Sequence, residues 1–236
     1  MLEHLPVYLS VLFCLIAIAA LILLQWTILG SDSRFTKKKA GITAIVLSAW
    51  LIIQAILALK NTYNTDTDAL PPKIILFGIL PMVIAIVSLF VSVKGRTFID
   101  SLPLERLTYL NLIRIPVEIG LYLLYLNKAV PEIMTFEGRN FDILAGITAP
   151  FIAWYGIRRG KLSPKLILLW NVICLALLIN IVFTALLSAP SPLQKFAFDQ
   201  PNIALPNFPF VWLPTLIVPI VFFGHLVSIR QLLRKI

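Results

Sequence analysis

Seven long apolar segments alternate with short polar connections along the chain. A helix needs roughly 20 apolar residues to cross the hydrocarbon of a membrane, where every backbone polar group must bond within the protein. The alternating strands of about 10 residues that are typical of a membrane barrel are absent from the sequence. The pattern therefore predicts an all-α integral membrane protein, a seven-transmembrane-helix bundle that forms one domain over residues 1–236. The expected helices are Pro6–Leu29, Ile42–Leu59, Ile74–Val93, Leu104–Leu126, Phe141–Ile157, Leu166–Leu187 and Val211–Leu233.

The composition favours a membrane location over a soluble domain. Hydrophobic residues make up 59% of the chain and charged residues only 13%, with a mean hydropathy of +0.94. Soluble domains carry about 25% charged residues. The net charge of +9 could indicate a nucleic-acid partner, but the basic residues stand at the ends of apolar segments, where membrane proteins place them. We therefore expect the lipid bilayer as a partner and no nucleic acid.

The lysines and arginines predict how the bundle is oriented. Fourteen of the 20 lie on the side where the first, third, fifth and seventh apolar segments end, with Arg106 and Arg230 just inside a segment end. Five lie in the other connections, and Arg114 lies near the middle of the fourth segment. Because cytoplasmic loops carry the excess of basic residues, the C-terminus is expected in the cytoplasm and the N-terminus outside the cell membrane (the inner membrane, for a bacterial protein). The N-terminal residues lack the basic region of a signal peptide, so the first segment is expected to remain as a helix.

One connection is long and unusual in composition. Residues 189–210 contain five prolines and four phenylalanines and fall on the external side of the predicted topology. Long loops in compact domains are commonly functional lids or disordered segments. We interpret residues 189–210 as an external cap loop that lies on the bundle. The alternative is a loop at the membrane surface whose phenylalanines enter the lipid.

The fourth apolar segment carries two ionisable residues near its middle. Arg114 and Glu118 are four residues apart, so they share a helix face, and Pro116 lies between them. Ionisable residues inside a membrane are costly and face a protein interior or a water-filled cavity. The polar stripe on this face continues in both directions, through Asn111, Tyr122 and Tyr125. It indicates either a ligand or ion site around Glu118 and Arg114, or a salt bridge that only fixes helix packing.

A second polar cluster leads into the fifth apolar segment. Glu137, Arg139, Asn140 and Asp142 are expected at the external surface. Asn140 could cap the fifth helix, and the Asp142 carboxylate suits the positive end of a helix dipole. The alternative is that this cluster forms the external mouth of a cavity whose floor is Glu118.

Asn180 is the remaining candidate ligand-binding residue. It shares a face with Thr184 in the external half of the sixth apolar segment. If this face points toward Glu118, Asn180 lines the same cavity. The alternative is a hydrogen bond that joins two helices, which is the usual role of such residues in membranes.

No catalytic or cofactor-binding pattern is present in the sequence. Its two histidines, His4 and His225, fall on opposite sides of the predicted membrane, which argues against multi-histidine metal and haem sites. The sequence lacks HExxH, GxSxG, P-loop and GxGxxG motifs. We therefore expect no cofactor, no metal and no catalytic residues.

Two functions fit these patterns. The favoured one is transport or binding of a small solute or ion through an externally open polar pocket around Glu118 and Arg114. The alternative is a sensor or an accessory subunit that transports nothing, in which the buried charges only fix the fold and a membrane protein partner or a second copy docks. An intramembrane enzyme is the least favoured class, because no catalytic constellation is visible.

Overall fold

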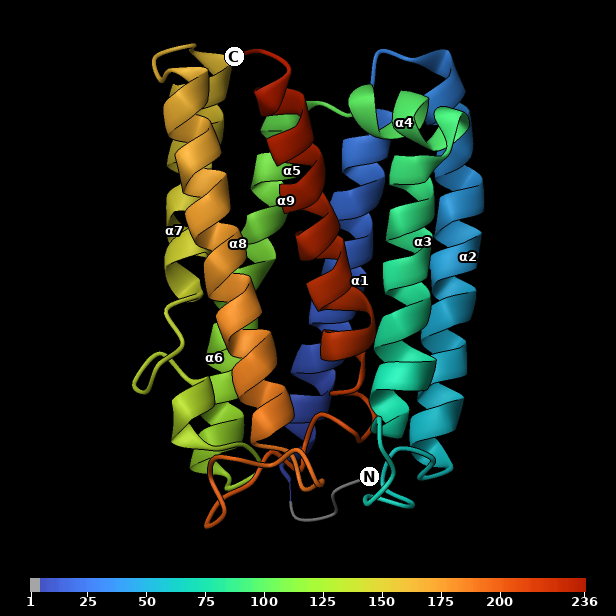
Figure 1. Cartoon of the computed structure of the whole chain (residues 1–236), viewed down its shortest axis with the longest axis vertical. Coiled ribbons are helices and arrows are strands. Elements are labelled where there is room, and N and C mark those ends of the chain that lie inside the picture. Colours follow the sequence, from blue (N-terminus) through green and yellow to red (C-terminus); the bar gives the residue numbers. More distant parts are fainter. Residues whose placement is uncertain (1–4) are drawn as a thin grey trace.

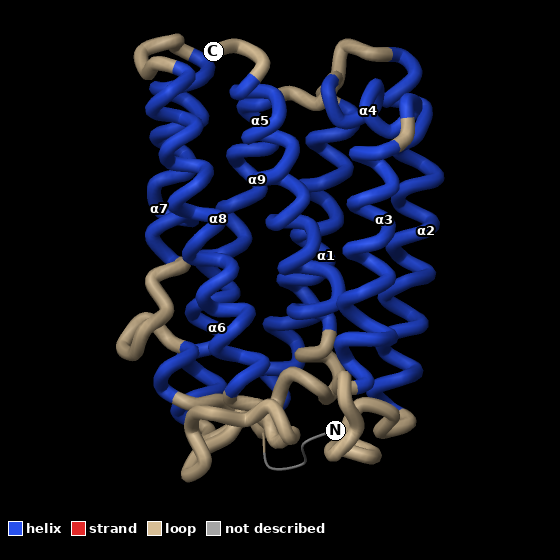
Figure 2. The backbone as a smooth tube through the Cα atoms, in the orientation of Figure 1, coloured by secondary structure: helices blue, strands red, loops and turns tan. Residues whose placement is uncertain are grey.

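The computed structural model describes residues 5–236, and those residues form helices and loops without a strand. His4 lies outside the described residues. The helices run side by side along the longest axis of the molecule, and loops close both ends (Figures 1 and 2). Several helices continue directly from a π or 3₁₀ segment (η). The elements are α1 Val7–Leu29, α2 Arg34–Leu59, η1 Ile75–Ile79, α3 Leu80–Val91, α4 Val93–Asp100, α5 Leu104–Tyr109, η2 Leu110–Ile113, α6 Arg114–Leu126, η3 Glu132–Met134, α7 Ile143–Phe151, η4 Ile152–Arg158, α8 Pro164–Leu187, η5 Leu213–Ile217 and α9 Val218–Leu233.

Five of these helical stretches are long and apolar enough to cross a membrane. A sixth is present if Ile75–Val91 and the short helix α4 are taken as one broken span, although the two are bent by 91°. Ile143–Arg158 is apolar but shorter. Residues 5–236 are therefore all-α with five or six candidate spans, and the long apolar helices are compatible with a membrane location.

Two of the candidate spans form the interior of the bundle. In the most apolar 18 residues of Leu104–Leu126 and of Leu213–Leu233, 61% of the residues are buried. The corresponding share is 17% in Arg34–Leu59 and 28% in Pro164–Leu187. In Figure 1, α2 and α3 lie on one side of these central helices and α7 and α8 lie on the other. The outer helices expose leucine, isoleucine and valine side chains along their length.

Helix α2 begins eight residues before the predicted start at Ile42. The Ser33 hydroxyl accepts a hydrogen bond from the Thr36 N–H and caps the helix at Arg34. The basic residues after Arg34 form the first turns of the helix instead of a loop. The hydropathy pattern missed these turns because it marks where a helix becomes apolar and not where it begins.

Prolines interrupt two helices, and α2 supplies the missing hydrogen bonds. Proline has no N–H, so Pro81 and Pro219 leave the carbonyls of Phe77 and Thr215, four residues earlier, without their usual donors. A π turn precedes each proline, η1 before Pro81 and η5 before Pro219. Gln54 Nε2 donates to the Phe77 carbonyl at 3.0 Å, and Trp50 Nε1 donates to the Thr215 carbonyl at 2.9 Å. Two side chains one turn apart on α2 therefore hold both broken helices.

The end of the bundle that carries the C-terminus is fastened by polar contacts between α4 and α9. Asp100 accepts from Arg230 Nε at 2.7 Å and from Arg234 Nη1 at 2.6 Å. Gln231 donates to the carbonyls of Ile99 and Leu102, each at 2.9 Å. The hydrogen bond from Arg230 holds the pKa of Asp100 below its ordinary value. These contacts keep α4 across the end of the bundle (Figure 1).

Residues 189–210 lie at the opposite end and are hydrogen-bonded to the loop between α6 and η3. Gln200 Nε2 donates to the Val130 carbonyl at 2.7 Å, and the Ile203 and Ala204 N–H groups donate to the Ala129 carbonyl. Phe210 is buried and packs edge-on against Phe13 of α1, whereas Phe198 is 72% exposed. The loop therefore covers this end of the bundle, with its phenylalanines divided between the interior and the surface.

Candidate functional site

Arg114 is among the largest side chains that are fully buried in the described chain. It begins α6, directly after the 3₁₀ segment η2. Its Nη1 lies 3.1 Å from Asp142 Oδ1, and Nη1 and Nη2 each donate to the Cys174 carbonyl of α8 at 3.2 Å. Within the part of the chain that the structure describes, no salt bridge joins Arg114 to Glu118. The ion pair connects α6 to the start of α7.

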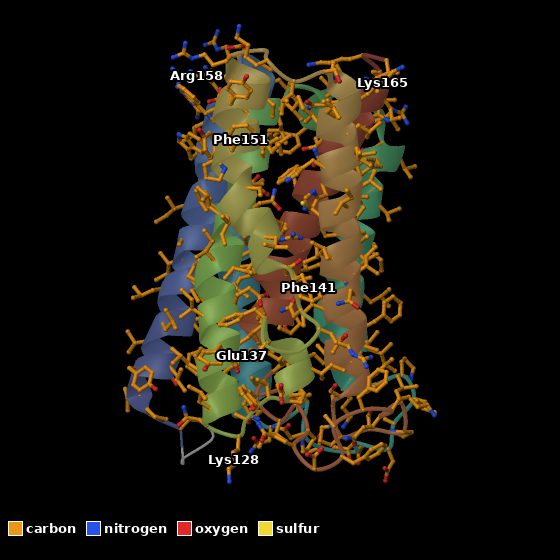
Figure 3. All side chains as sticks on the ribbon, turned by 90° about the vertical axis from the view of Figure 1, so that its left-hand side faces the viewer. Lys128, Glu137, Phe141, Phe151, Arg158 and Lys165 are labelled. Carbon is orange, nitrogen blue, oxygen red and sulfur yellow. The ribbon has the colours of Figure 1, made fainter. Side chains whose placement is uncertain are left out.

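The Asp142 carboxylate lies deep in the bundle, not at the external surface where the sequence placed it. It is 3% exposed and precedes α7, whose π continuation η4 ends at Arg158. Figure 3 shows Arg158 at one end of the molecule and Phe141 near the middle of its height. At 1.5 Å per residue, Ile143–Arg158 covers at most ~24 Å, less than the ~30 Å of a bilayer core. The preceding loop therefore lies on the flank of the bundle with Glu137 and Arg139 exposed, and it turns the Asp142 side chain inward to Arg114 (Figure 1). We call residues 134–142 the inserted loop.

Asn140 holds this inserted loop and the second carboxylate together. Its Nδ2 donates to Glu118 Oε2 at 2.6 Å and to the Met134 carbonyl at 3.1 Å, and its Oδ1 accepts from the Asp142 N–H. Glu118 is 1% exposed and Asn140 is fully buried. Asn140 was expected to cap the fifth helix or to lie in an external mouth. It does neither, because the N-cap position falls on Asp142 and the Asn140 side chain is committed to Glu118. We call Arg114, Glu118, Asn140 and Asp142 the charged cluster.

Several buried polar atoms around this cluster have no hydrogen-bond partner in the described chain. They are Arg114 Nε, Asn111 Oδ1 and His225 Nε2, whereas Asp142 Oδ1 accepts no hydrogen bond but faces Arg114 Nη1 at 3.1 Å in the ion pair. The Asn111 amide nitrogen is bonded to the Thr108 carbonyl, which leaves only its oxygen free. Buried polar atoms are almost always paired, so several unpaired atoms on adjoining segments need an explanation.

His225 belongs to the same interior. It is fully buried on α9, and its Nδ1 lies 3.0 Å from Asn171 Oδ1 of α8. The Asn171 amide nitrogen already donates to the Ile167 carbonyl. His225 Nδ1 must therefore carry the proton, and Nε2 is left as an unpaired acceptor. A lone histidine in an apolar helix was the only signal in the sequence.

The remaining candidate residues lie outside the charged cluster. Tyr122 is half-buried and packs its ring against Phe136, with the centroids 4.9 Å apart. Asn180 is exposed and donates to the Arg139 carbonyl at 3.0 Å, so it fastens α8 to the inserted loop instead of facing Glu118. The side chains of Glu137 and Arg139 are exposed, and Glu137 lies toward the end of the bundle that carries Lys128 (Figure 3).

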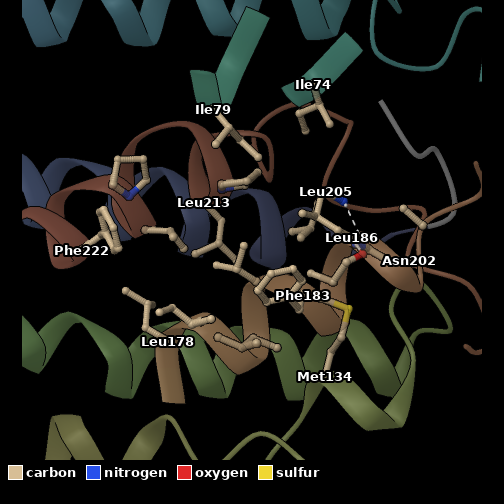
Figure 4. A pocket seen from close by; sticks show the side chains of 18 of the residues that line it. Ile74, Ile79, Met134, Leu178, Phe183, Leu186, Asn202, Leu205, Leu213 and Phe222 are labelled. Carbon is tan, nitrogen blue, oxygen red and sulfur yellow. Dashed lines mark hydrogen bonds between the residues drawn. The ribbon is translucent and has the colours of Figure 1, made fainter. Parts of the chain in front are cut away.

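A hollow next to the cluster has a different chemistry. It has a volume of about 240 Å³ and is lined almost entirely by apolar side chains of α3, α8, α9 and the loop over residues 202–206 (Figure 4). Met134 connects the two regions, because its side chain lines the hollow and its carbonyl binds Asn140. No group of three histidine, cysteine or carboxylate side chains suited to a metal ion occurs among residues 5–236.

Comparison with known families gives one match. The family model described as "Domain of unknown function (DUF8737)" matches residues 71–233, which is more than half of the chain and contains the whole charged cluster. No curated protein and no solved structure matches the chain.

Proposed function

We propose that this chain, which belongs to the DUF8737 family, is a seven-helix membrane protein that binds a small solute or ion at the charged cluster and carries it across the membrane. In this proposal the N-terminus is outside and the C-terminus is in the cytoplasm. Ile75–Val91 and Ile143–Arg158 complete the seven, with Ile143–Arg158 as a short helix whose N-terminal end stops at the charged cluster.

The inserted loop is the single observation that carries the proposal. Irregular backbone at membrane depth is tolerated only where protein buries it or where it lines a cavity. Transporters use interrupted helices of this kind to form binding sites near the middle of the membrane. Residues 134–142 bring Asn140 and Asp142 to the depth of Arg114 and Glu118, and three of these four side chains are ionisable.

The energetics also favour a functional reading of the cluster. A charged residue in the middle of a membrane helix costs about 2.5–3.5 kcal/mol on insertion scales. A buried ion pair is commonly no more stable than a well-packed apolar replacement. Apolar packing would therefore hold α6 against α7 at a lower desolvation cost than two carboxylates, one arginine and several unpaired atoms.

The externally open pocket belongs to a second conformation in this proposal. Glu118 and Arg114 are only 1% and 2% exposed, so the conformation described here is a closed one. Movement of the inserted loop would open the site toward the end that residues 189–210 cover, where Glu137 and Arg139 are exposed. Glu137 and Arg139 would then line the entrance to the site.

A second function, a sensor or accessory subunit without transport, is favoured by one contact. The Arg114–Asp142 ion pair by itself satisfies most of the charge and connects two helices. In that case the cluster only fixes the fold. This function predicts that purification from native membranes yields a membrane protein partner in stoichiometric amount.

The test is ligand-induced stabilisation of purified protein against a panel of small solutes and ions. The double variant R114Q/E118Q is compared with D66N/K73Q, which neutralises an exposed ion pair of 2.6 Å in the α2–α3 loop. We expect a ligand that raises the melting temperature of the wild type and of D66N/K73Q but not of R114Q/E118Q. The same variants are then compared for uptake of this ligand into proteoliposomes. Equal stabilisation and uptake in both double variants would overturn the proposal.

A further inference from the structure

The charges of the cluster do not balance. Arg114 supplies one positive charge, whereas Glu118 and Asp142 supply two carboxylates. We propose that the species bound at Glu118 is a monovalent cation, either a proton or an alkali-type ion. This inference rests on the proposed function, and it names the class of ligand that the site takes.

The arginine is already committed elsewhere. Its two terminal nitrogens face Asp142 and the Cys174 carbonyl. Glu118 receives only the Asn140 amide, and no salt bridge among residues 5–236 includes it. An ionised carboxylate without a cation is strongly disfavoured in a buried site. Glu118 therefore needs a positive charge that the described side chains around it do not supply.

The unpaired atoms indicate the same sign of charge. Two of the three are acceptors, namely Asn111 Oδ1 and, by the tautomer argument, His225 Nε2. Only Arg114 Nε is a donor. A region with surplus acceptors suits a ligand that brings positive charge or donors, and a second carboxylate would repel an anion.

The acceptors lie on segments that pack around η2. Gly146, one turn after Asp142, packs closely against η2. A Cβ atom at this position would lie only 3.2 Å from the Asn111 carbonyl oxygen. Gly224, next to His225, faces Leu110 of the same segment, so α7 and α9 both approach η2. A divalent ion is disfavoured, because no group of three metal-binding side chains is present among residues 5–236. One net negative charge matches one monovalent cation.

The experiment measures the melting temperature of the full chain in nanodiscs. Na⁺, Li⁺, K⁺ or NH₄⁺ replaces N-methylglucamine at constant ionic strength, and each series is repeated from pH 5 to pH 8. A ligand at a hundredfold excess over its Kd should raise the melting temperature of the wild type by about 5–10 °C. E118Q should lose this dependence, E118D should keep it with weaker affinity, and D66N/K73Q should match the wild type.

The arms distinguish the two kinds of cation. If the cation is an alkali-type ion, the melting temperature of the wild type rises with the concentration of that ion. If it is a proton, the wild type becomes more stable relative to E118Q as the pH falls. Arg114, Asp142 and His225 are the other ionisable groups of this interior, and they are common to both proteins, so the difference between wild type and E118Q isolates Glu118. If neither cations nor protons distinguish the wild type and E118D from E118Q, the inference is overturned. Solute stabilisation that still depends on Arg114 and Glu118 would then leave the proposed function standing.

Discussion

Two regions of this bundle bury polar groups in opposite ways. On one side, Trp50 and Gln54 of α2 donate to carbonyls that Pro219 and Pro81 leave free. Both are neutral, and the Gln54 oxygen is itself bonded by the Tyr63 hydroxyl. On the other side, the charged cluster brings ionisable groups into the interior, and buried atoms without partners lie in the same interior.

The difference separates a structural solution from a functional one. A neutral donor placed on a neutral carbonyl satisfies the backbone at little cost, which is all that a broken helix requires. Charges and unpaired atoms add a desolvation cost that does not improve packing. Buried atoms without partners are therefore a better sign of function than buried polarity alone. In the described chain Ser188 Oγ, at the end of α8, is one such atom, and Arg114 Nε, Asn111 Oδ1 and His225 Nε2 lie in the interior that holds the charged cluster.

The largest expected effect comes from removing one member of the buried ion pair. D142N keeps the shape of the side chain but leaves the Arg114 guanidinium without its counter-charge. Breaking a buried pair in this way costs about 3–5 kcal/mol of stability. Reversible unfolding in detergent micelles measures this cost.

The double variant R114Q/D142N is the matched control for this prediction. It removes both charges, so much of the lost stability should return, and the double-mutant cycle should give a coupling of about 0.5–3 kcal/mol. If D142N is as stable as the exposed control D66N/K73Q, the contrast between the two regions fails.

A smaller effect is expected on the proline side. W50F removes the indole donor and leaves the Thr215 carbonyl unpaired, which costs about 1–3 kcal/mol. P219A restores an N–H that can bond this carbonyl, so W50F should cost clearly less in the P219A background. Melting temperatures of the four proteins measure the coupling. An equal cost in both backgrounds would show that Trp50 stabilises through packing and not through the freed carbonyl.

The sequence predicted an all-α chain with long apolar helices and singled out Arg114 and Glu118, because hydropathy and isolated charges are local signals. It did not predict the depth of Asp142. The loop before Ile143 is polar, as surface loops are, and nothing local indicates that the Asn140 and Asp142 side chains turn into the bundle. The partners of Arg114 were hidden for a second reason, since the Cys174 carbonyl is a backbone group and every residue has one. The sequence shows that Pro81 and Pro219 each leave a carbonyl without its usual donor. It does not show that the replacement donors come from α2, because that depends on how the helices pack.

The smallest expected effect comes from a third polar contact, the partly exposed ion pair between Asp100 and the arginines of α9. The carboxylate is 24% exposed, so water already solvates part of the charge. Exposed pairs are worth about 0.2–1 kcal/mol, and D100N should therefore cost much less than D142N. Chemical unfolding at neutral pH compares the two variants directly.

The pH dependence of this pair has a definite sign. The hydrogen bond from Arg230 lowers the pKa of Asp100 in the folded state, below the unfolded value of about 3.9. Its contribution is therefore complete above the unfolded pKa and is lost as the pH falls through the lowered folded pKa. The stability difference between wild type and D100N should stay constant from pH 7 to pH 5 and shrink below pH 4. R234Q, which leaves Arg230 bound to Asp100, should reproduce only part of the effect. A difference that is unchanged at pH 3 would mean that the contact stabilises through the geometry of α4 and not through charge.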